Sequence, residues 1–128
     1  DALDERAREL IAAVGLSDFE RAVAVELPYG RKRALEIATT LALDPEMMLH
    51  DEPTAGMTHE DVERISALIK RVAEKRTVLM VEHNLSVVST LSDTITVLQR
   101  GEVLAAGDYQ TVSKNPQVIE AYLGSGHA

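Results

Sequence analysis

Two short apolar runs, each followed by polar residues, constrain the fold of this chain most. They are Met47–Leu49 and Thr77–Val81, and runs of this length are typical of buried strands. Between them, Thr58 precedes apolar residues at helical spacing, which predicts a helix capped by Thr58. The order strand, helix, strand predicts an α/β fold with a mostly parallel sheet, whose strands end at a shared edge.

The flanking segments predict helices before this unit and a hairpin after it. Apolar periodicity predicts one helix that ends at Gly15 and another that opens at Tyr29, with a mixed stretch that includes a short helix over Leu16–Leu27. Gly101, between two apolar and β-branched stretches, predicts a hairpin turn. The predicted sheet is therefore flanked by helices and followed by a carboxyl-terminal β-hairpin, with small helices that start at Ser86, Asp108 and Asn115–Pro116.

Composition excludes several classes of function. The 128 residues allow one domain or part of one. Thirteen Lys and Arg against 21 Asp and Glu give a net charge of -8, which argues against a nucleic-acid partner. Cysteine is absent, so disulfides and thiolate metal sites are excluded, and no apolar run is long enough for membrane insertion. The chain starts at Asp1 without Met, and we expect it to be cut from a longer polypeptide.

The ends of the two strands carry the residues that could take part in catalysis or ligand binding. Asp51 and Glu52 follow the first strand and His83 follows the second, so all three are expected at one crevice. A hydrated Mg²⁺ on Asp51 and a polarised water on Glu52 would explain the two adjacent carboxylates. The alternative interpretation is a strand that ends in solvent, where acids are common, and a lone His is more often a packed or surface residue.

The helix start at Leu27–Arg33 is the other candidate site. Gly30 permits close backbone approach, and the free N–H groups of a helix start attract anions, an effect that three basic residues strengthen. The alternative interpretation is a solvated basic first turn, in which the positive charges oppose the helix dipole.

The order of these segments resembles the nucleotide-binding domain of ABC transporters. Gly30 and Asp51 are 21 positions apart, and Asp51 and His83 are 32 apart, which suits that family. In the resemblance, Leu27–Arg33 matches the signature motif, Met47–Glu52 the Walker B motif, Thr54–His59 the D-loop and His83 the switch histidine. The match covers essentially the whole chain, and the combination of motifs is specific although each motif alone is weak.

The resemblance implies an ATPase that uses ATP and Mg²⁺, in which two such domains sandwich two ATP molecules. Asp51 would hold Mg²⁺ through water, Glu52 would polarise the attacking water and His83 would contact the γ-phosphate. ATP bound to the other subunit would meet the signature residues Leu27, Pro28, Tyr29, Gly30 and Arg31. The D-loop residues near it would be Ala55, Gly56, Met57 and Thr58.

This sequence departs from the family pattern at several positions. Pro28 stands where the signature usually has Ser, Thr58 where the D-loop usually has Asp, and His59 where Pro is common. His50 replaces an apolar Walker B residue, so its ring needs a partner on a buried strand.

The chain contains no G-x-x-x-x-G-K-[ST] phosphate loop. We therefore expect it to be the carboxyl-terminal part of one P-loop NTPase-like domain. Residues 1–45 would be part of the helical subdomain, and residues 46–128 would carry Walker B, the D-loop, the switch His and the carboxyl-terminal region. Alone, the piece should be inactive, and its bare sheet should make it self-associate.

The segment Val118–Gly124, with Ala55–Met57, most resembles the branched-chain amino acid transporter ATPases. Urea or amide uptake and lipopolysaccharide-export ATPases are near relatives. The implied partners are a second nucleotide-binding subunit, identical or different, and transmembrane permease subunits at the cytoplasmic face of the inner membrane. Alternatives are a non-catalytic interaction module that has lost the phosphate loop, and a chromosome-maintenance or repair ATPase, although the long heptad arms of the latter are absent.

Overall fold

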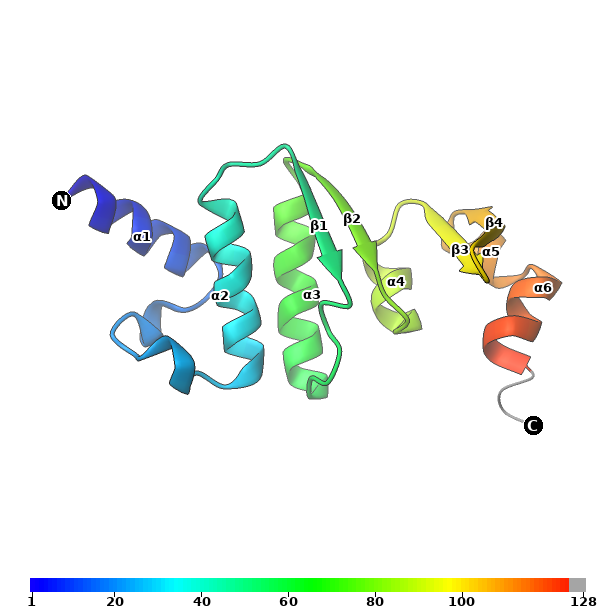
Figure 1. Cartoon of the computed structure of the whole chain (residues 1–128), viewed down its shortest axis with the longest axis horizontal. Helices are drawn as coiled ribbons and strands as arrows, with labels where there is room; N and C mark the ends of the chain where they lie inside the picture. Colours follow the sequence, from blue (N-terminus) through cyan, green and yellow to red (C-terminus); the bar gives the residue numbers. More distant parts are fainter. Residues whose placement is uncertain (125–128) are drawn as a thin grey trace. The chain divides into compact units, whose positions relative to one another are not determined.

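The computed structural model describes residues 1–124, which form two compact units (Figure 1). Unit 1 is Asp1–His83 and unit 2 begins at Asn84. The sequence-based division between residues 45 and 46 stays a prediction. No helix in the described part of the chain has both the length and the apolar character needed to cross a bilayer.

Unit 1 opens with helices, as the apolar periodicity predicted. Helix α1 covers Ala2–Ala13 and α2 covers Tyr29–Leu41. The expected short helix between them is instead two 3₁₀ turns, Ser17–Phe19 and Ala24–Glu26. Apolar positions in this stretch do not recur at helical spacing, so only single turns form.

The strand–helix–strand order is confirmed in the second half of unit 1. Strand β1 (Met47–Asp51) and strand β2 (Thr77–Val81) pair in parallel, and their register runs from Met47 opposite Thr77 to Asp51 opposite Val81. Helix α3 (His59–Ala73) connects them. Its predicted cap is confirmed, because the Thr58 hydroxyl accepts a hydrogen bond from the Asp61 N–H at 3.2 Å.

The core of unit 1 lies between the helices and one face of this sheet. Helix α2 packs against both α1 and α3, and Met48 and Ile65 are fully buried. The expectation that both strands are buried is wrong for the opposite face, where Leu49 is 71% and Val81 61% exposed. Side chains alternate across a strand, and among the described residues only one face of the sheet is covered.

Unit 2 contains the predicted hairpin. Strands β3 (Ile95–Gln99) and β4 (Glu102–Gly107) are antiparallel, and the turn uses positive φ at Arg100 and Gly101, which matches the twist of a hairpin. Helix α4 (Leu85–Leu91) begins one residue before the predicted Ser86, because the Asn84 side chain caps it.

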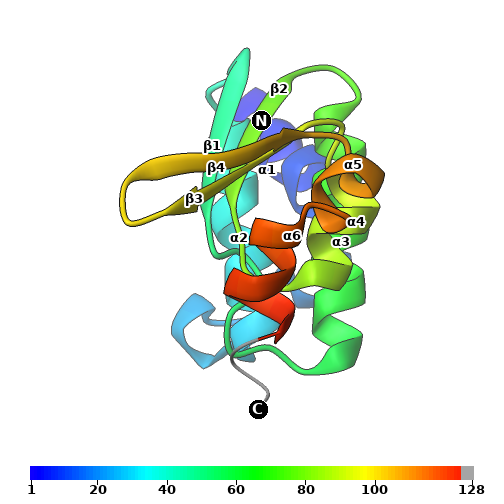
Figure 2. The same ribbon diagram turned by 90° about the vertical axis from the view of Figure 1, so that its right-hand side faces the viewer.

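Short helical turns complete unit 2, and Figure 2 shows the hairpin in front with α5 and α6 beside it. They are α5 (Tyr109–Ser113), α6 (Pro116–Val118) and a π-helical turn over Ile119–Gly124. The predicted starts of these helices at Asp108 and Asn115–Pro116 are confirmed, and the side chains of Asp108 and Asn115 cap them. Hydrogen bonds from Thr111 hold the pKa of the Asp108 carboxyl below its usual value.

Candidate active site

The parallel register brings the polar ends of β1 and β2 to one edge of unit 1. The Glu52 N–H donates to the Val81 carbonyl at 2.7 Å, which extends the ladder one residue past β1. The Glu52 carboxylate then lies 2.8 Å, Oε1 to Nδ1, from His83. The structure thus brings together two of the residues that the sequence nominated for catalysis, from positions 31 apart in the chain.

Glu52 holds an unusual backbone conformation. Its φ is +47°, a region that non-glycine residues rarely adopt and that costs about 1–3 kcal/mol. The Glu52 and His83 side chains are 46% and 69% exposed, and an exposed ion pair contributes only about 0–1 kcal/mol. The pair therefore does not by itself account for the geometry of this turn.

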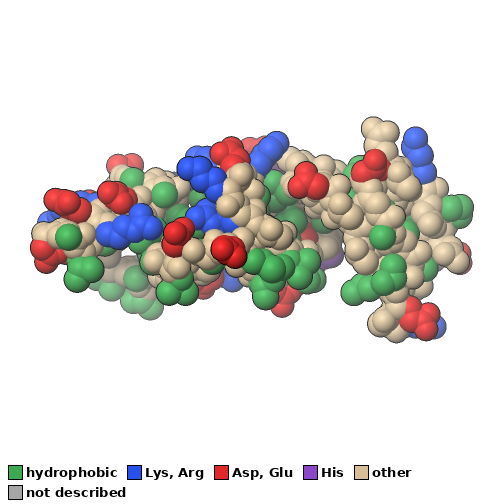
Figure 3. All heavy atoms as spheres, turned by 90° about the horizontal axis from the view of Figure 1, so that it is seen from above, with side chains coloured by type: hydrophobic (Ala, Val, Ile, Leu, Met, Phe, Trp, Pro, Cys, Tyr) green, Lys and Arg blue, Asp and Glu red, His purple; other side chains and the backbone are tan. Residues whose placement is uncertain are grey.

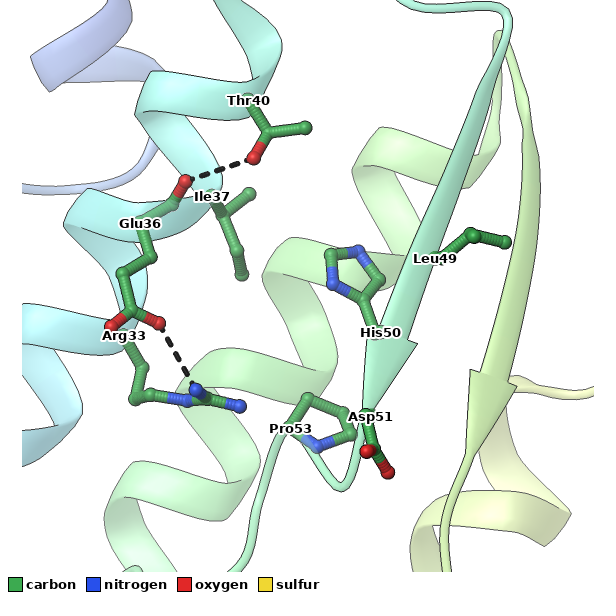
Figure 4. Close-up of a pocket in the computed structure, with 8 residues that line it drawn as sticks. All are labelled: Arg33, Glu36, Ile37, Thr40, Leu49, His50, Asp51 and Pro53. Atoms are coloured by element: carbon green, nitrogen blue, oxygen red, sulfur yellow. Dashed lines mark hydrogen bonds and ion pairs between the residues drawn. The ribbon is translucent and has the colours of Figure 1, made fainter.

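Asp51 lies beside the pair as the last residue of β1. It is exposed, and alternation along the strand puts it on the same face as Leu49, away from His50 (Figure 4). Among residues 1–124, no cluster of three or more acidic or His side chains could hold a metal ion. One carboxylate nevertheless suits Mg²⁺, which keeps most of its waters and is otherwise bound by substrate phosphates.

Glu82, which the sequence analysis did not single out, is the buried member of this edge. Its side chain is only 1% exposed, and its Oε2 accepts hydrogen bonds from the hydroxyl of Thr54 at 2.7 Å and the N–H of Thr54 at 3.3 Å. Its Oε1 accepts from the His83 N–H at 3.0 Å. A carboxylate directly before the candidate histidine, at the end of an apolar strand, is the sequence signal that identifies it.

The predicted anion-attracting helix start is the beginning of α2. Pro28 is its N-cap and offers no side-chain hydrogen bond, although its carbonyl accepts from the N–H groups of Arg31 and Lys32. Leu27 and Gly30 are buried, whereas Tyr29 is 52% exposed. Among the described residues of unit 1, no hydrogen bond or ion pair joins this helix start to Glu52 or His83.

Two of the three basic residues at this helix start are engaged elsewhere. The Arg31 guanidinium donates to the Gly15 carbonyl at 3.3 Å and lies 5.0 Å from the centre of the Phe19 ring. Arg33 pairs with Glu36 at 3.0 Å. In the described part of the chain Lys32 has neither a side-chain hydrogen bond nor an ion pair, so it is the cation of this turn that is left for an external anion.

Gly30 lies against the first turn of α3. A Cβ atom at this position would be 2.6 Å from Cγ of Asp61, which is closer than real contacts allow. Asp61 also pairs with Arg64 at 2.6 Å. Glycine is therefore required here for close approach of two helices, and a carboxylate already lies beside the start of α2.

The four D-loop candidates form the turn that leads from the site into α3. The Ala55 N–H donates to the Glu52 carbonyl at 3.2 Å, and the Met57 N–H donates to the Thr54 carbonyl at 3.3 Å. Gly56 has φ +73° and open space around it, and Thr58 caps α3.

A hollow of about 250 Å³ lies between α2 and β1 (Figure 4). The imidazole of His50 points from β1 toward α2, and its Nε2 is buried with no hydrogen-bond partner among the described residues, so the partner expected for this ring is not found. Burial, with a smaller effect of Arg33, holds the pKa of His50 below its usual value. The hollow is lined by Arg33, Glu36, Ile37, Thr40, Leu49, His50, Asp51 and Pro53.

The sequence matches two families of known proteins. Residues 2–55 match the family described as ABC transporter. Residues 102–128 match the family described as branched-chain amino acid ATP-binding cassette transporter.

Curated relatives agree with these matches. The chain is 37% identical over 122 residues to the high-affinity branched-chain amino acid transport ATP-binding protein BraF of Pseudomonas aeruginosa, covering 94% of this chain and 48% of that protein. LivG of Escherichia coli, a protein with the same description, is 36% identical over 126 residues, covering 97% of this chain and 49% of that protein. Methionine import ATP-binding protein MetN 2 of Pectobacterium atrosepticum is 35% identical over 114 residues, covering 88% of this chain and 34% of that protein.

A solved structure shares the fold. An ATP-binding cassette of an ABC transporter, in its ADP conformation, superposes with a TM-score of 0.85 at 29% identity, over 97% of this chain and 51% of that one. The chain spans about half the length of BraF, LivG and this cassette, and about a third of MetN 2. Sequence and fold agree along nearly all of its residues, and the chain therefore belongs to the family of ABC transporter ATP-binding proteins.

Proposed function

We propose that the complete protein carrying this chain hydrolyses ATP to drive import through a membrane transporter. The observation that carries this proposal is the 2.8 Å contact between Glu52 and His83 at the carboxyl ends of two parallel strands, the edge where α/β sheets bind ligands. Glu52 polarises the attacking water, and His83 contacts the γ-phosphate. Asp51 would hold Mg²⁺ through water, and the ion would neutralise charge on the phosphates.

The helix start and the D-loop turn serve a second subunit in this proposal. Leu27–Arg31 present the start of α2 to ATP bound on the partner, and Lys32 adds a positive charge that no described side chain neutralises. Ala55–Thr58 lie near the same ATP. The partners are thus a second nucleotide-binding subunit and the permease subunits, which hold the protein at the cytoplasmic face of the inner membrane.

The proposed cargo is a branched-chain amino acid. Support comes from the match of residues 102–128 and from the printed function of BraF. The likeness to a methionine importer defines the competing cargo. Uptake of labelled leucine and methionine by cells that lack the gene separates the two, and loss of leucine uptake alone is expected.

The catalytic assignment is tested by Glu52→Gln in the complete polypeptide. Loss of a positioned base lowers kcat by about 10²–10⁴-fold, and His83→Ala should act in the same direction. Glu63→Gln is a matched control, because Glu63 forms an exposed pair with His59 on α3 at 3.3 Å. ATP hydrolysis by Glu52→Gln at the wild-type rate contradicts the assignment.

The 128-residue chain alone should neither hydrolyse ATP nor bind it tightly, because no phosphate loop is present in it. We interpret residues 1–45 as part of the helical subdomain and residues 46–128 as the remainder of the domain's carboxyl-terminal part. Calorimetry on this chain that detects micromolar Mg-ATP binding contradicts this interpretation.

A further inference from the structure

Glu82 is a buried carboxylate beside an exposed pair. Its side chain is 1% exposed, whereas those of Glu52 and His83 are 46% and 69% exposed. A charged group is buried only where donors replace its lost hydration, so its surroundings must provide several hydrogen bonds.

The two oxygens of Glu82 bind two different segments. Oε2 receives both the hydroxyl and the backbone N–H of Thr54, at 2.7 and 3.3 Å, and Thr54 is itself only 4% exposed. Oε1 receives the backbone N–H of His83 at 3.0 Å. One carboxylate thus joins the loop after β1 to the segment that follows β2.

We propose that Glu82 is the positioning residue of the Glu52–His83 pair, an inference that rests on the function proposed above. It does not touch the reacting atoms in this proposal. It acts by holding the backbone on both sides of the pair, so that the carboxylate and the imidazole meet before substrate arrives.

The backbone of Glu52 explains why such a clamp is needed. At φ +47° the chain leaves β1 in a conformation that a Glu does not prefer. The Glu52 N–H is fixed on one side by the Val81 carbonyl, and Thr54 is fixed two residues later by Glu82. These two anchors flank the turn, and both depend on the end of β2.

A carboxylate side chain suits this role, whereas an amide side chain does not. Both oxygens of Glu82 accept, and the donors that reach them come from opposite segments. In Glu82→Gln one oxygen becomes an NH₂ group, which cannot accept, so a donor on Thr54 or His83 loses its acceptor. A displacement of about 1 Å at a reacting group lowers the rate about 10²-fold.

The experiment compares four variants of the complete polypeptide in steady-state ATP hydrolysis. Glu82→Gln and Thr54→Val, which removes only the hydroxyl, should lower kcat about 10–100-fold and leave KM for ATP within about twofold. Thr54→Ser keeps the hydroxyl and should restore most of kcat. Glu46→Gln makes the same charge change at an exposed residue before β1 and should match wild type.

The outcomes separate this inference from the proposed function. If Glu52→Gln is inactive while Glu82→Gln and Thr54→Val keep wild-type kcat, Glu82 is not a positioning residue and the proposed function stands. A rise in KM that equals the fall in kcat also overturns the inference. If Glu82→Gln does not fold, Thr54→Val decides alone, since Glu82 is intact in it. Wild-type activity of Glu52→Gln instead overturns the proposed function.

Discussion

The two faces of the β1–β2 sheet in unit 1 differ although the residues on them are alike. Met48 is 1% exposed and lies on the face toward the helices, whereas its neighbour Leu49 is 71% exposed on the other. Leu79 and Val81 of β2 are 56% and 61% exposed on that same side. We call this side, which carries Leu49, Leu79 and Val81, the bare face. An apolar side chain contributes to stability only where another element removes it from water. Met48 therefore stabilises the fold, whereas the adjacent Leu49 contributes little.

The bare face is also where the self-association expected of this chain would take place. Exposed contiguous apolar surface and open strand edges favour pairing with other chains. In the view of Figure 3, acidic and basic side chains are interspersed over unit 1, and hydrophobic side chains also reach the surface. The two faces should therefore differ in their contribution to stability as they do in exposure.

Met48→Ala should have the largest effect on stability. Loss of a fully buried methionine lowers the free energy of unfolding by about 2–5 kcal/mol, through lost transfer energy and the cavity left behind. Urea denaturation at low protein concentration measures it. Leu49→Ala is the matched control on the bare face and should change the value by about 0.5 kcal/mol or less. Equal losses of unfolding free energy for Met48→Ala and Leu49→Ala would contradict the difference between the two faces, because they would mean that the bare face is covered.

Leu49→Lys should weaken self-association more than it changes folding. A leucine buried between two chains contributes about 1.5–3 kcal/mol, which is roughly a 10–100-fold change in the association constant. Sedimentation equilibrium measures this change. Lys70→Ala, at an exposed residue of α3, is the control and should associate as wild type does. A monodisperse monomer for the wild-type chain at high concentration contradicts the expectation.

Gly30→Ala should disturb the contact of α2 with α3 on the covered side. Its Cβ would lie 2.6 Å from Cγ of Asp61, and such overpacking costs about 1–3 kcal/mol, partly offset by the better helix propensity of Ala. The test is a double-mutant cycle with Asp61→Ala, which should recover most of the loss. If the double variant is no more stable than the sum of the two single changes predicts, the contact is not the cause.

His50→Leu should stabilise the covered face by about 1 kcal/mol, because it removes a buried nitrogen that has no partner. It should also change the pH dependence. The lowered pKa of His50 means that the unfolded chain takes up this proton near pH 6.5 while the folded chain does not. Wild-type stability should therefore fall as pH decreases from about 6.5 and level off below the folded pKa.

Unfolding midpoints measured from pH 7.5 to 5 separate this contribution. The slope difference between wild type and His50→Leu is the contribution of His50. Identical slopes for wild type and His50→Leu contradict the account.

Local chemistry allowed much of the fold to be predicted. Thr58 and Asp108 could be placed at helix starts because short polar side chains accept from the first free N–H groups, and both do so. Asn115–Pro116 was predicted to start the last helix, and the Asn115 side chain caps it. Gly101 marked the hairpin for a similarly local reason, its positive φ. The two strands and their connecting helix followed from the length and period of apolar residues.

The candidate site was predictable in part. Asp51, Glu52 and His83 could be nominated because they lie at or just beyond the carboxyl ends of two strands. The place of Glu82 before His83 could mark it as a candidate, but its burial and its bonds to Thr54 could not be predicted, since they depend on a turn 28 residues away. The contacts of Arg31 with the Gly15 carbonyl and the Phe19 ring could not be predicted for the same reason. The residues at a helix start do not show which groups of the preceding segment lie near them.

By itself, the sequence determined the order of strands and helices, the capped helix starts and the class of chemistry available at the strand ends. These depend on interactions within a few residues, which periodicity and side-chain type encode. Tertiary structure alone decided which sheet face is covered, that the His50 nitrogen has no described partner, and that Glu52 meets His83 while Glu82 holds both flanks. Those outcomes depend on distances between segments far apart in the chain, which only packing and strand register fix.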